Sequence, residues 1–183
     1  MLNKKKIFIF CSFLIFIIII MGFLFNGKVK DNGILNIKYK VASGTSWSRY
    51  YKNGSTASLN GDNLTGIKIK MNKKYKYSVY TSLFYNDVWS NQMSIEQLNK
   101  SKINKPIYGM KLSTTSRIFK DYSICYRTYN SKDHWLNWVC NGEITGNIKY
   151  PIKKVEIKII PNNVIFNEYL KDYDVKDDIN VGF

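Results

Sequence analysis

The stretch "HWLNWVCNGEITG", residues 134–146, places two Trp, one Cys and two Gly in a chain rich in Lys, Asn and Ile. A partial copy, "SWSRYYKNGSTAS", occupies residues 46–58. In both stretches a Gly follows the first Trp by seven residues. The pairs are Trp47 with Gly54 and Trp135 with Gly142. Because Gly adopts positive φ at little cost, we expect a tight turn at both glycines.

Segments that alternate apolar and polar residues lie on both sides of these stretches. Alternation at period two is typical of half-buried strands in an antiparallel sheet, and the β-branched and aromatic residues in these segments favour strands as well. The predicted strands are residues 37–41, 67–71, 77–81, 108–112, 122–128 and 155–159.

The predicted strands form three pairs in which matching residues lie 32 or 33 positions apart, namely Ile37 and Ile69, Tyr77 and Met110, and Ile124 and Ile157. At least one Trp lies between the two members of each pair. This spacing predicts three repeats of about four strands, at 37–71, 75–112 and 122–160. One such unit cannot bury its apolar face alone, so we expect the three to share one core. The predicted fold is all-β with pseudo-threefold repeats, first as a β-prism, second as a β-trefoil and third as a plain sandwich.

The tryptophans have two alternative roles in this scheme. A Trp buries roughly 200 Å² and fills a small core efficiently, so we expect Trp47, Trp89 and Trp135 to meet in the shared centre. Trp138 lies three residues after Trp135, and in a continuous strand the two would point to opposite faces. Trp138 and Tyr51 are therefore the candidate ligand-binding aromatics, suited to stacking on sugar rings.

The third repeat resembles the clostridial hydrophobic W repeat, the ChW family. The matching residues are Trp135, Trp138, Val139, Gly142 and Gly146, followed by the strand Val155 to Ile159. The first repeat matches less fully, and the middle repeat keeps Trp89 and the end strands only. The resemblance implies a secreted or surface protein of a Gram-positive, clostridium-like bacterium. It also implies a binding role at the cell wall or toward extracellular macromolecules, with no catalytic residues.

The first 25 residues predict on which side of the membrane the domain lies. Residues 1–6 are basic, and residues 7–25 form an apolar run of nineteen residues without a charge. As a helix this run spans about 28 Å, close to the thickness of the hydrocarbon core. We expect residues 1–6 in the cytoplasm, a single-pass anchor at 7–25, and a spacer at 26–36 that leads to an extracellular domain at 37–160. A cleaved signal peptide, and hence a secreted protein, is the alternative.

The net charge of +15 suits anionic partners, although the abundance of Lys, Asn and Ile fits a general composition bias equally well. Inside the domain the run "MNKKYK" at 71–76 is the densest group of lysines, and no specific polyanion groove is indicated. An exterior location also disfavours nucleic acid. Residues 161–183 carry several acids and little periodic apolar content. We expect an extended acidic tail there.

Chemistry-bearing residues are few. Cys125 and Cys140 are fifteen residues apart, and a hairpin with its turn near 131–134 would let them face each other as a possible disulfide. With one His, His134, the chain offers no convincing zinc site and no Ser/His/Asp or Cys/His catalytic set. We therefore expect no enzyme activity, no metal and no cofactor.

These observations favour a non-catalytic, membrane-anchored extracellular binding module. Its expected partner is cell-wall glycan, an anionic polymer or another extracellular macromolecule. Two alternatives stay open: a structural or assembly protein of the cell envelope that binds a protein partner, and a secreted adhesin or effector.

Overall fold

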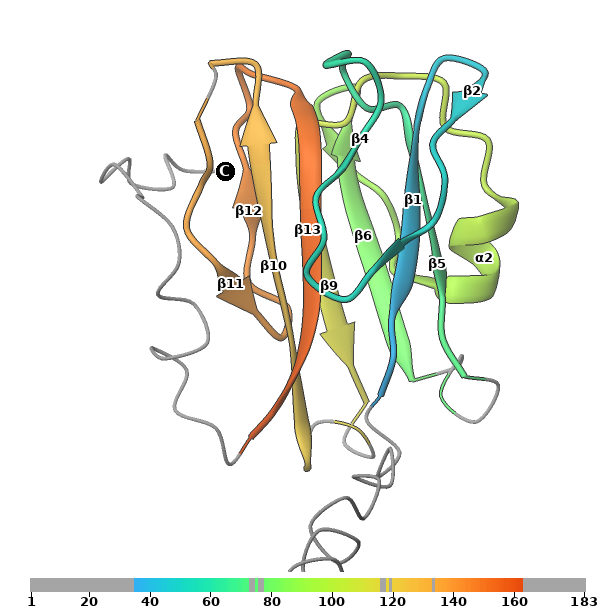
Figure 1. Ribbon diagram of the computed structural model, residues 1–183. Helices are drawn as coiled ribbons and strands as arrows, with labels where there is room; N and C mark the ends of the chain where they lie inside the picture. The colour runs from blue at the N-terminus through green and yellow to red at the C-terminus, as the bar shows by residue number, and fades with distance from the viewer. Residues whose placement is uncertain are drawn as a thin grey trace, which may run out of the picture. The chain divides into compact units, whose positions relative to one another are not determined.

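The fold is given by a computed structural model that describes residues 35–72, 75, 78–115, 118, 120–132 and 134–162. Strands predominate in this part of the chain, and helix α2 (Ile95–Lys100) is short (Figure 1). The prediction of an all-β class is therefore confirmed.

Three antiparallel sheets, named A, B and C, make up the described chain, and each is built on one pair of long strands. Sheet A contains β1 (Lys38–Ser43), β5 (Gly66–Lys70), β2 (Ser46–Trp47) and β3 (Tyr51–Lys52). Sheet B contains β10 (Tyr122–Asn130), β13 (Ile152–Pro161), β11 (Val139–Cys140) and β4 (Ala57–Ser58). Sheet C contains β6 (Val79–Tyr85), β9 (Gly109–Thr114), β7 (Val88–Trp89), β8 (Met93–Ser94) and β12 (Thr145–Gly146).

The long strands β1, β5, β6, β9, β10 and β13 lie where apolar alternation predicts strands, with ends shifted by a few residues. The alternation also predicts which side chains point inward. In β1, Tyr39 and Val41 are fully buried, whereas Lys38 is exposed and Lys40 is half-buried. Period two therefore reports the buried face correctly, because successive side chains of a strand point to opposite sides of the sheet.

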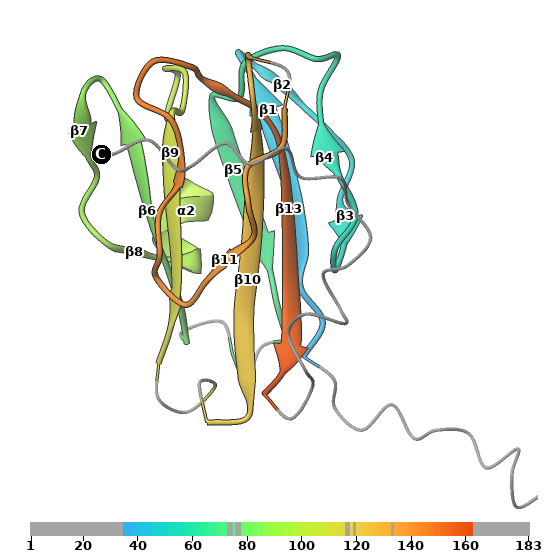
Figure 2. The ribbon, with the colours of Figure 1, turned by 90° about the vertical axis from the view of Figure 1, so that its left-hand side faces the viewer.

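Sheets B and C each take a short strand from a distant part of the chain. Strand β4, which follows β3 of sheet A, pairs with β13 of sheet B. Strand β12, which follows β11 of sheet B, pairs with β9 of sheet C. In Figure 2, β3 and β4 run alongside β13. Strand β4 therefore links the chain of sheet A to sheet B, and strand β12 links the chain of sheet B to sheet C.

Helix α2 has the corresponding position beside sheet A and packs against β5 (Figure 1). It starts with a capping box, in which the Ser94 hydroxyl accepts from the Gln97 N–H and the Gln97 side chain accepts from the Ser94 N–H. The side-chain amide of Asn99 accepts from the Ile69 N–H at 2.9 Å and donates to the Ile69 carbonyl at 2.8 Å. The Asn99 amide thus pairs with the backbone N–H and carbonyl at the edge of β5. At the corresponding edges, β4 pairs with β13 in sheet B and β12 pairs with β9 in sheet C.

The core lies between the three sheets and consists of aliphatic and Tyr side chains from all of them. The prediction that three indole rings fill this centre is wrong. Trp47 is 36% exposed, and Trp89 and Trp135 are only partly buried. The inward positions of the long strands already carry Ile, Val, Leu and Tyr, so the indoles pack on the outer faces of the sheets instead.

The three tryptophans nevertheless have one structural position in common. Each follows the turn after the first long strand of its sheet and pairs back onto the end of that strand. The paired residues are Ala42 with Trp47, Phe84 with Trp89, and Tyr129 with Trp135. Each indole therefore lies over the outward-facing side chains of its own sheet.

Gly54 and Gly142 have φ values of 77° and 102°, which fits the tight turns expected after the tryptophans. Cys125 of β10 and Cys140 of β11 are directly opposite in register and are joined by a disulfide. The hairpin between 122 and 140 thus brings these two residues face to face, as their spacing suggests.

The predicted basic tail (1–6) and anchor (7–25) lie outside the described residues, as do nearly all of the spacer and the acidic tail. Among the residues that are described, no helix is long and apolar enough to cross a membrane. Leu35 is buried in the core, so the domain begins two residues before the predicted boundary.

Candidate functional site

The outer face of sheet A gathers lysines around two aromatic rings. We define the lysine–aromatic face as Lys40, Trp47, Tyr50, Lys68 and Lys70. Strand alternation places the lysines outward on β1 and β5, and Lys40 lies directly opposite Lys68 in register. Trp47 reaches this face from β2, which pairs back onto the end of β1.

The cations and rings are in direct contact. The Lys40 Nζ lies 5.0 Å from the centroid of the Trp47 ring, and the Lys68 Nζ lies 4.6 Å from it. Lys40 and Lys70 approach the Tyr50 ring at 5.1 and 4.4 Å. Each cation–π contact at such an exposed site is worth about 0.5–1 kcal/mol. The contacts hold the lysine side chains beside the rings, with their charged ends toward solvent.

Within the part of the chain that the structure describes, no carboxylate forms an ion pair with a lysine of this face. In the described chain the ion pairs are Lys100 with Glu96 and Arg127 with Glu156, and neither involves a lysine of the face. Like charges that face each other across an antiparallel pair are destabilising. An anion that sits near Lys40 and Lys68 would relieve this repulsion, so the face is suited to bind anionic groups.

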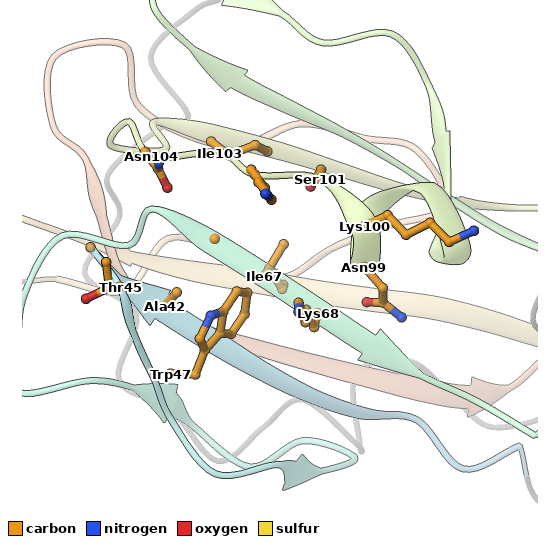
Figure 3. A pocket seen from close by; sticks show the side chains of 13 residues that line it. Ala42, Thr45, Trp47, Ile67, Lys68, Asn99, Lys100, Ser101, Ile103 and Asn104 are labelled. Carbon is orange, nitrogen blue, oxygen red and sulfur yellow. The ribbon is translucent and has the colours of Figure 1, made fainter.

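A cavity of about 350 Å³ adjoins the face (Figure 3). Trp47 and Thr45 lie on one side of it, Ser101 and Asn104 lie on the other, and β5 with Lys68 lies between them. A volume of this size accommodates one or two sugar rings. The cavity thus combines a flat aromatic ring, a cation and polar side chains, which are the groups that sugar recognition needs.

Sheet C carries a reduced version of this arrangement. The Lys111 Nζ lies 4.2 Å from the centroid of the Trp89 ring, and Trp89 also packs against Phe84 with ring centroids 5.4 Å apart. Across the strand pair, Lys111 faces Ser82. Sheet C therefore presents one lysine beside its indole, where sheet A presents two.

Sheet B has the same layout with its charges neutralised internally. Arg127 faces Glu156 across the strand pair, and the two form an ion pair of 2.8 Å in which both side chains are almost completely buried. The Arg127 guanidinium lies 4.4 Å from the Trp135 ring and 4.9 Å from the Trp138 ring. Thr56, from the loop before β4, donates a hydrogen bond to the Glu156 carboxylate.

Neither predicted ligand-binding aromatic has the expected surroundings. Trp138 is half-buried and covers Arg127 together with Trp135, so the expectation that these two rings point to opposite faces is wrong. Residues 136–138 do not continue a strand, so the alternation rule does not apply. Tyr51 is half-buried and packs against the core, whereas its neighbour Tyr50 lies beside the outward lysines.

Sequence reasoning missed Tyr50 and the outward lysines of sheet A. The available signal was the pair of segments "IKYK" and "IKIK", which put lysines at alternate positions of two predicted strands. Antiparallel pairing of these strands gathers their lysines on one face. The signal is weak in a chain with 28 Lys and Arg residues, because alternating lysines are also ordinary solvent-facing residues.

Among the described residues, Tyr126 and Tyr39 have clearly shifted pKa values, and both lie in the core and not on the lysine–aromatic face. Burial raises the pKa of Tyr126 to about 12, and burial likewise raises the pKa of Tyr39 far above its usual value. The Tyr39 hydroxyl donates to the Ser55 carbonyl and accepts from the Ile157 N–H. The Tyr126 hydroxyl donates to the Glu143 carbonyl, so both hydroxyls fix loops against the long strands and their function is structural.

No protein-family model, no curated protein and no solved structure matches this chain.

Proposed function

We propose that residues 35–162 form an extracellular, non-catalytic binding module for an acidic surface polysaccharide, tethered to the cell membrane by residues 7–25. The lysine–aromatic face of sheet A, with its adjoining cavity, is the proposed binding site. The observation that carries the proposal is the pair Lys40 and Lys68, which face each other beside Trp47 with no carboxylate from the described chain between them.

The chemistry of the face fits a polymer of sugar rings that bear acid groups. An indole face stacks on the apolar face of a sugar ring, and lysines at its edge attract carboxylate or phosphate groups. The net charge of +15 favours approach of any polyanion, and the face adds two lysines beside a flat indole ring next to a cavity.

The proposal includes the finer architecture. The common position of Trp47, Trp89 and Trp135 supports three repeats arranged as a β-prism, in which β4, α2 and β12 each cover the sheet of another repeat. The resemblance of the third repeat to ChW units supports the same role, since that family is associated with binding at bacterial surfaces. The apolar run at 7–25 supports a membrane anchor.

The test is binding of the full chain, purified in detergent, to immobilised polymers. Polygalacturonate carries carboxylates, teichoic acid carries phosphates, and dextran is the neutral control. We expect retention on at least one acidic polymer, weak retention on dextran, and a decline as salt rises. Failure to bind either acidic polymer at low salt would refute the proposal and leave an envelope protein that binds a protein partner as the better account.

Matched variants separate the face from general basicity. Trp47→Ala and the double variant Lys40→Gln/Lys68→Gln should each weaken binding at least tenfold. The double variant Lys132→Gln/Lys149→Gln removes the same charge from exposed positions outside the face and should change binding less than twofold. Equal losses in both double variants would show that binding depends on total charge and not on this site.

A further inference from the structure

We infer that the domain carries a second copy of the binding site on sheet C, at Trp89 and Lys111, and that both sites recognise an acid group on a sugar ring. This inference rests on the proposed function of the sheet A face. The same structural position recurs in the three sheets.

Backbone pairing defines the corresponding positions. In each sheet the residue after the indole donates its N–H to the first long strand. The pairs are Ser48 with the Val41 carbonyl at 2.9 Å, Ser90 with the Leu83 carbonyl at 2.8 Å, and Leu136 with the Thr128 carbonyl at 2.9 Å. In sheets A and C the serine hydroxyl also accepts from the same strand residue, at 3.1 and 3.0 Å.

The correspondence fixes which outward side chains lie beneath each indole. On the first long strand they are Lys40, Ser82 and Arg127, and opposite them on the last long strand they are Lys68, Lys111 and Glu156. Each indole of the first-strand turn contacts at least one cation of its own sheet. The three positions therefore share a layout and differ in charge.

In sheet B the cation beneath the indole is paired with a carboxylate of the chain itself. The Glu156 carboxylate accepts a hydrogen bond from the Arg127 Nε at 2.8 Å, forms an ion pair with the Arg127 Nη2 at 2.8 Å, and accepts a second hydrogen bond from Thr56. Trp135 and Trp138 flank the guanidinium. Sheet B thus holds a carboxylate next to a cation and an indole, and that carboxylate belongs to the chain itself.

Sheets A and C carry a lysine where sheet B carries Glu156. The indole and a cation are retained, and no carboxylate of the described residues occupies the position of Glu156. A carboxylate or phosphate on a bound sugar would supply the missing group in each sheet. Sheet A offers two lysines and an adjoining cavity, whereas sheet C offers Lys111 opposite the neutral Ser82. We therefore expect the sheet C site to be the weaker one.

Two sites on one domain have a consequence for long ligands. Once one site holds a polymer, the other binds a second segment of the same strand at a high effective concentration. Short oligomers bind each site separately and gain nothing from this effect. Length dependence of the affinity therefore distinguishes two sites from one.

The experiment is calorimetric titration of the full chain with digalacturonate and with glucose 6-phosphate, alongside binding of long polygalacturonate and teichoic acid. We expect two short ligands per chain in the wild type, one after Trp47→Ala, one after Trp89→Ala, and none in the double variant. Each single variant should lose at least tenfold in affinity for the long polymer. The pair of ligands decides whether the acid group is a carboxylate or a phosphate.

The outcomes separate the two proposals. A stoichiometry of one, with Trp89→Ala unchanged in affinity for the long polymer, would overturn the second site and leave the sheet A site intact. No binding of either chemistry to the wild type would overturn both. Lys111→Gln tests the same site without removing an aromatic ring. If circular dichroism shows that Trp89→Ala is misfolded, the binding of Lys111→Gln decides the result.

Discussion

Replacing Glu156 by Gln tests the buried ion pair of sheet B directly. The change keeps the shape of the side chain and removes its charge. Arg127, with no exposed side-chain area, then retains a positive charge without its partner carboxylate. Removing one member of a buried pair destabilises a protein by about 3–5 kcal/mol. Because Gln still offers one oxygen to Arg127 and Thr56, we expect about 3 kcal/mol.

The measurement is urea unfolding of the full chain, with the disulfide intact, followed by tryptophan fluorescence. With a urea dependence of about 2 kcal/mol per molar, the midpoint should fall by about 1.5 M. Glu143→Gln is the matched control, because Glu143 is exposed and the same chemical change there should stay within about 0.5 kcal/mol.

A second variant separates burial of charge from loss of packing. Replacing both partners, as Arg127→Met with Glu156→Leu, leaves no unpaired charge and should restore most of the lost stability. A loss below about 1 kcal/mol for Glu156→Gln would refute the reasoning. So would a double variant that is no more stable than Glu156→Gln.

Further predictions concern the disulfide, an interior tyrosine and one glycine. Because the disulfide closes a loop of fifteen residues, Cys125→Ala with Cys140→Ala should lower the unfolding free energy by about 3 kcal/mol in urea. Burial raises the pKa of Tyr126 to about 12, so the unfolded chain ionises first above pH 10. Stability should then fall by about 1.4 kcal/mol per pH unit up to pH 12, and Tyr126→Phe should remove this part of the slope measured in urea. A Cβ on Gly146 would lie 2.1 Å from a carbonyl oxygen next to β9, so Gly146→Ala should cost at least 3 kcal/mol in thermal unfolding. Gly61→Ala meets nothing within 4 Å and should cost about 1 kcal/mol from its positive φ alone.

The long strands could be predicted because burial of one sheet face dictates period two. "IKYKV" and "VEIKI" show this pattern over their full length, and both lie in long strands of the structure. The partners of the short strands could not be predicted in the same way. Nothing in the sequence indicates that Ala57 and Ser58 pair with β13. Alternation predicts which face of a strand is buried, but it does not predict which strand lies next to it.

The indoles show a second limit. Trp47, Trp89 and Trp135 each lie between the two predicted end strands of a repeat, and this recurrence indicates a common position without saying which side of the sheet it occupies. We expected the interior because a large ring fills a core well. The interior is instead filled by the side chains of the long strands, such as Tyr39 and Tyr126. The ring size that suggested a core role also suits packing over lysine and arginine side chains.

The candidate site was hidden in the sequence for a related reason. Lysines at alternate strand positions are common on solvent-facing sheets, and Lys40 and Lys68 become notable only when the register places them opposite each other beside Trp47. That register depends on tertiary pairing. The difference between Tyr50 and Tyr51 likewise depends on tertiary pairing, because Tyr51 is the first residue of β3, which pairs with β1, and Tyr50 lies just before that strand.

The contrast between sheets A and B leads to a last prediction, which opposes stability to binding. Lys68→Glu places a carboxylate opposite Lys40, as Glu156 lies opposite Arg127 in sheet B. A repulsive cross-strand pair becomes an attractive one, which is worth about 0.2–1 kcal/mol on a partly exposed face. The same change removes a cation from the proposed site and adds an acid that competes with the ligand. We therefore expect the variant to unfold at a slightly higher urea concentration and to lose acidic-polymer binding at least tenfold.

Lys149→Glu is the matched charge reversal outside the face and should leave binding within about threefold. If Lys68→Glu lowers stability, or if it binds acidic polymers as well as Lys149→Glu does, the lysine pair is an ordinary solvent-facing feature. If both effects appear, the two lysines repel each other in the free protein and are retained because they bind the acid. Such a loss of stability in return for function is common in proteins.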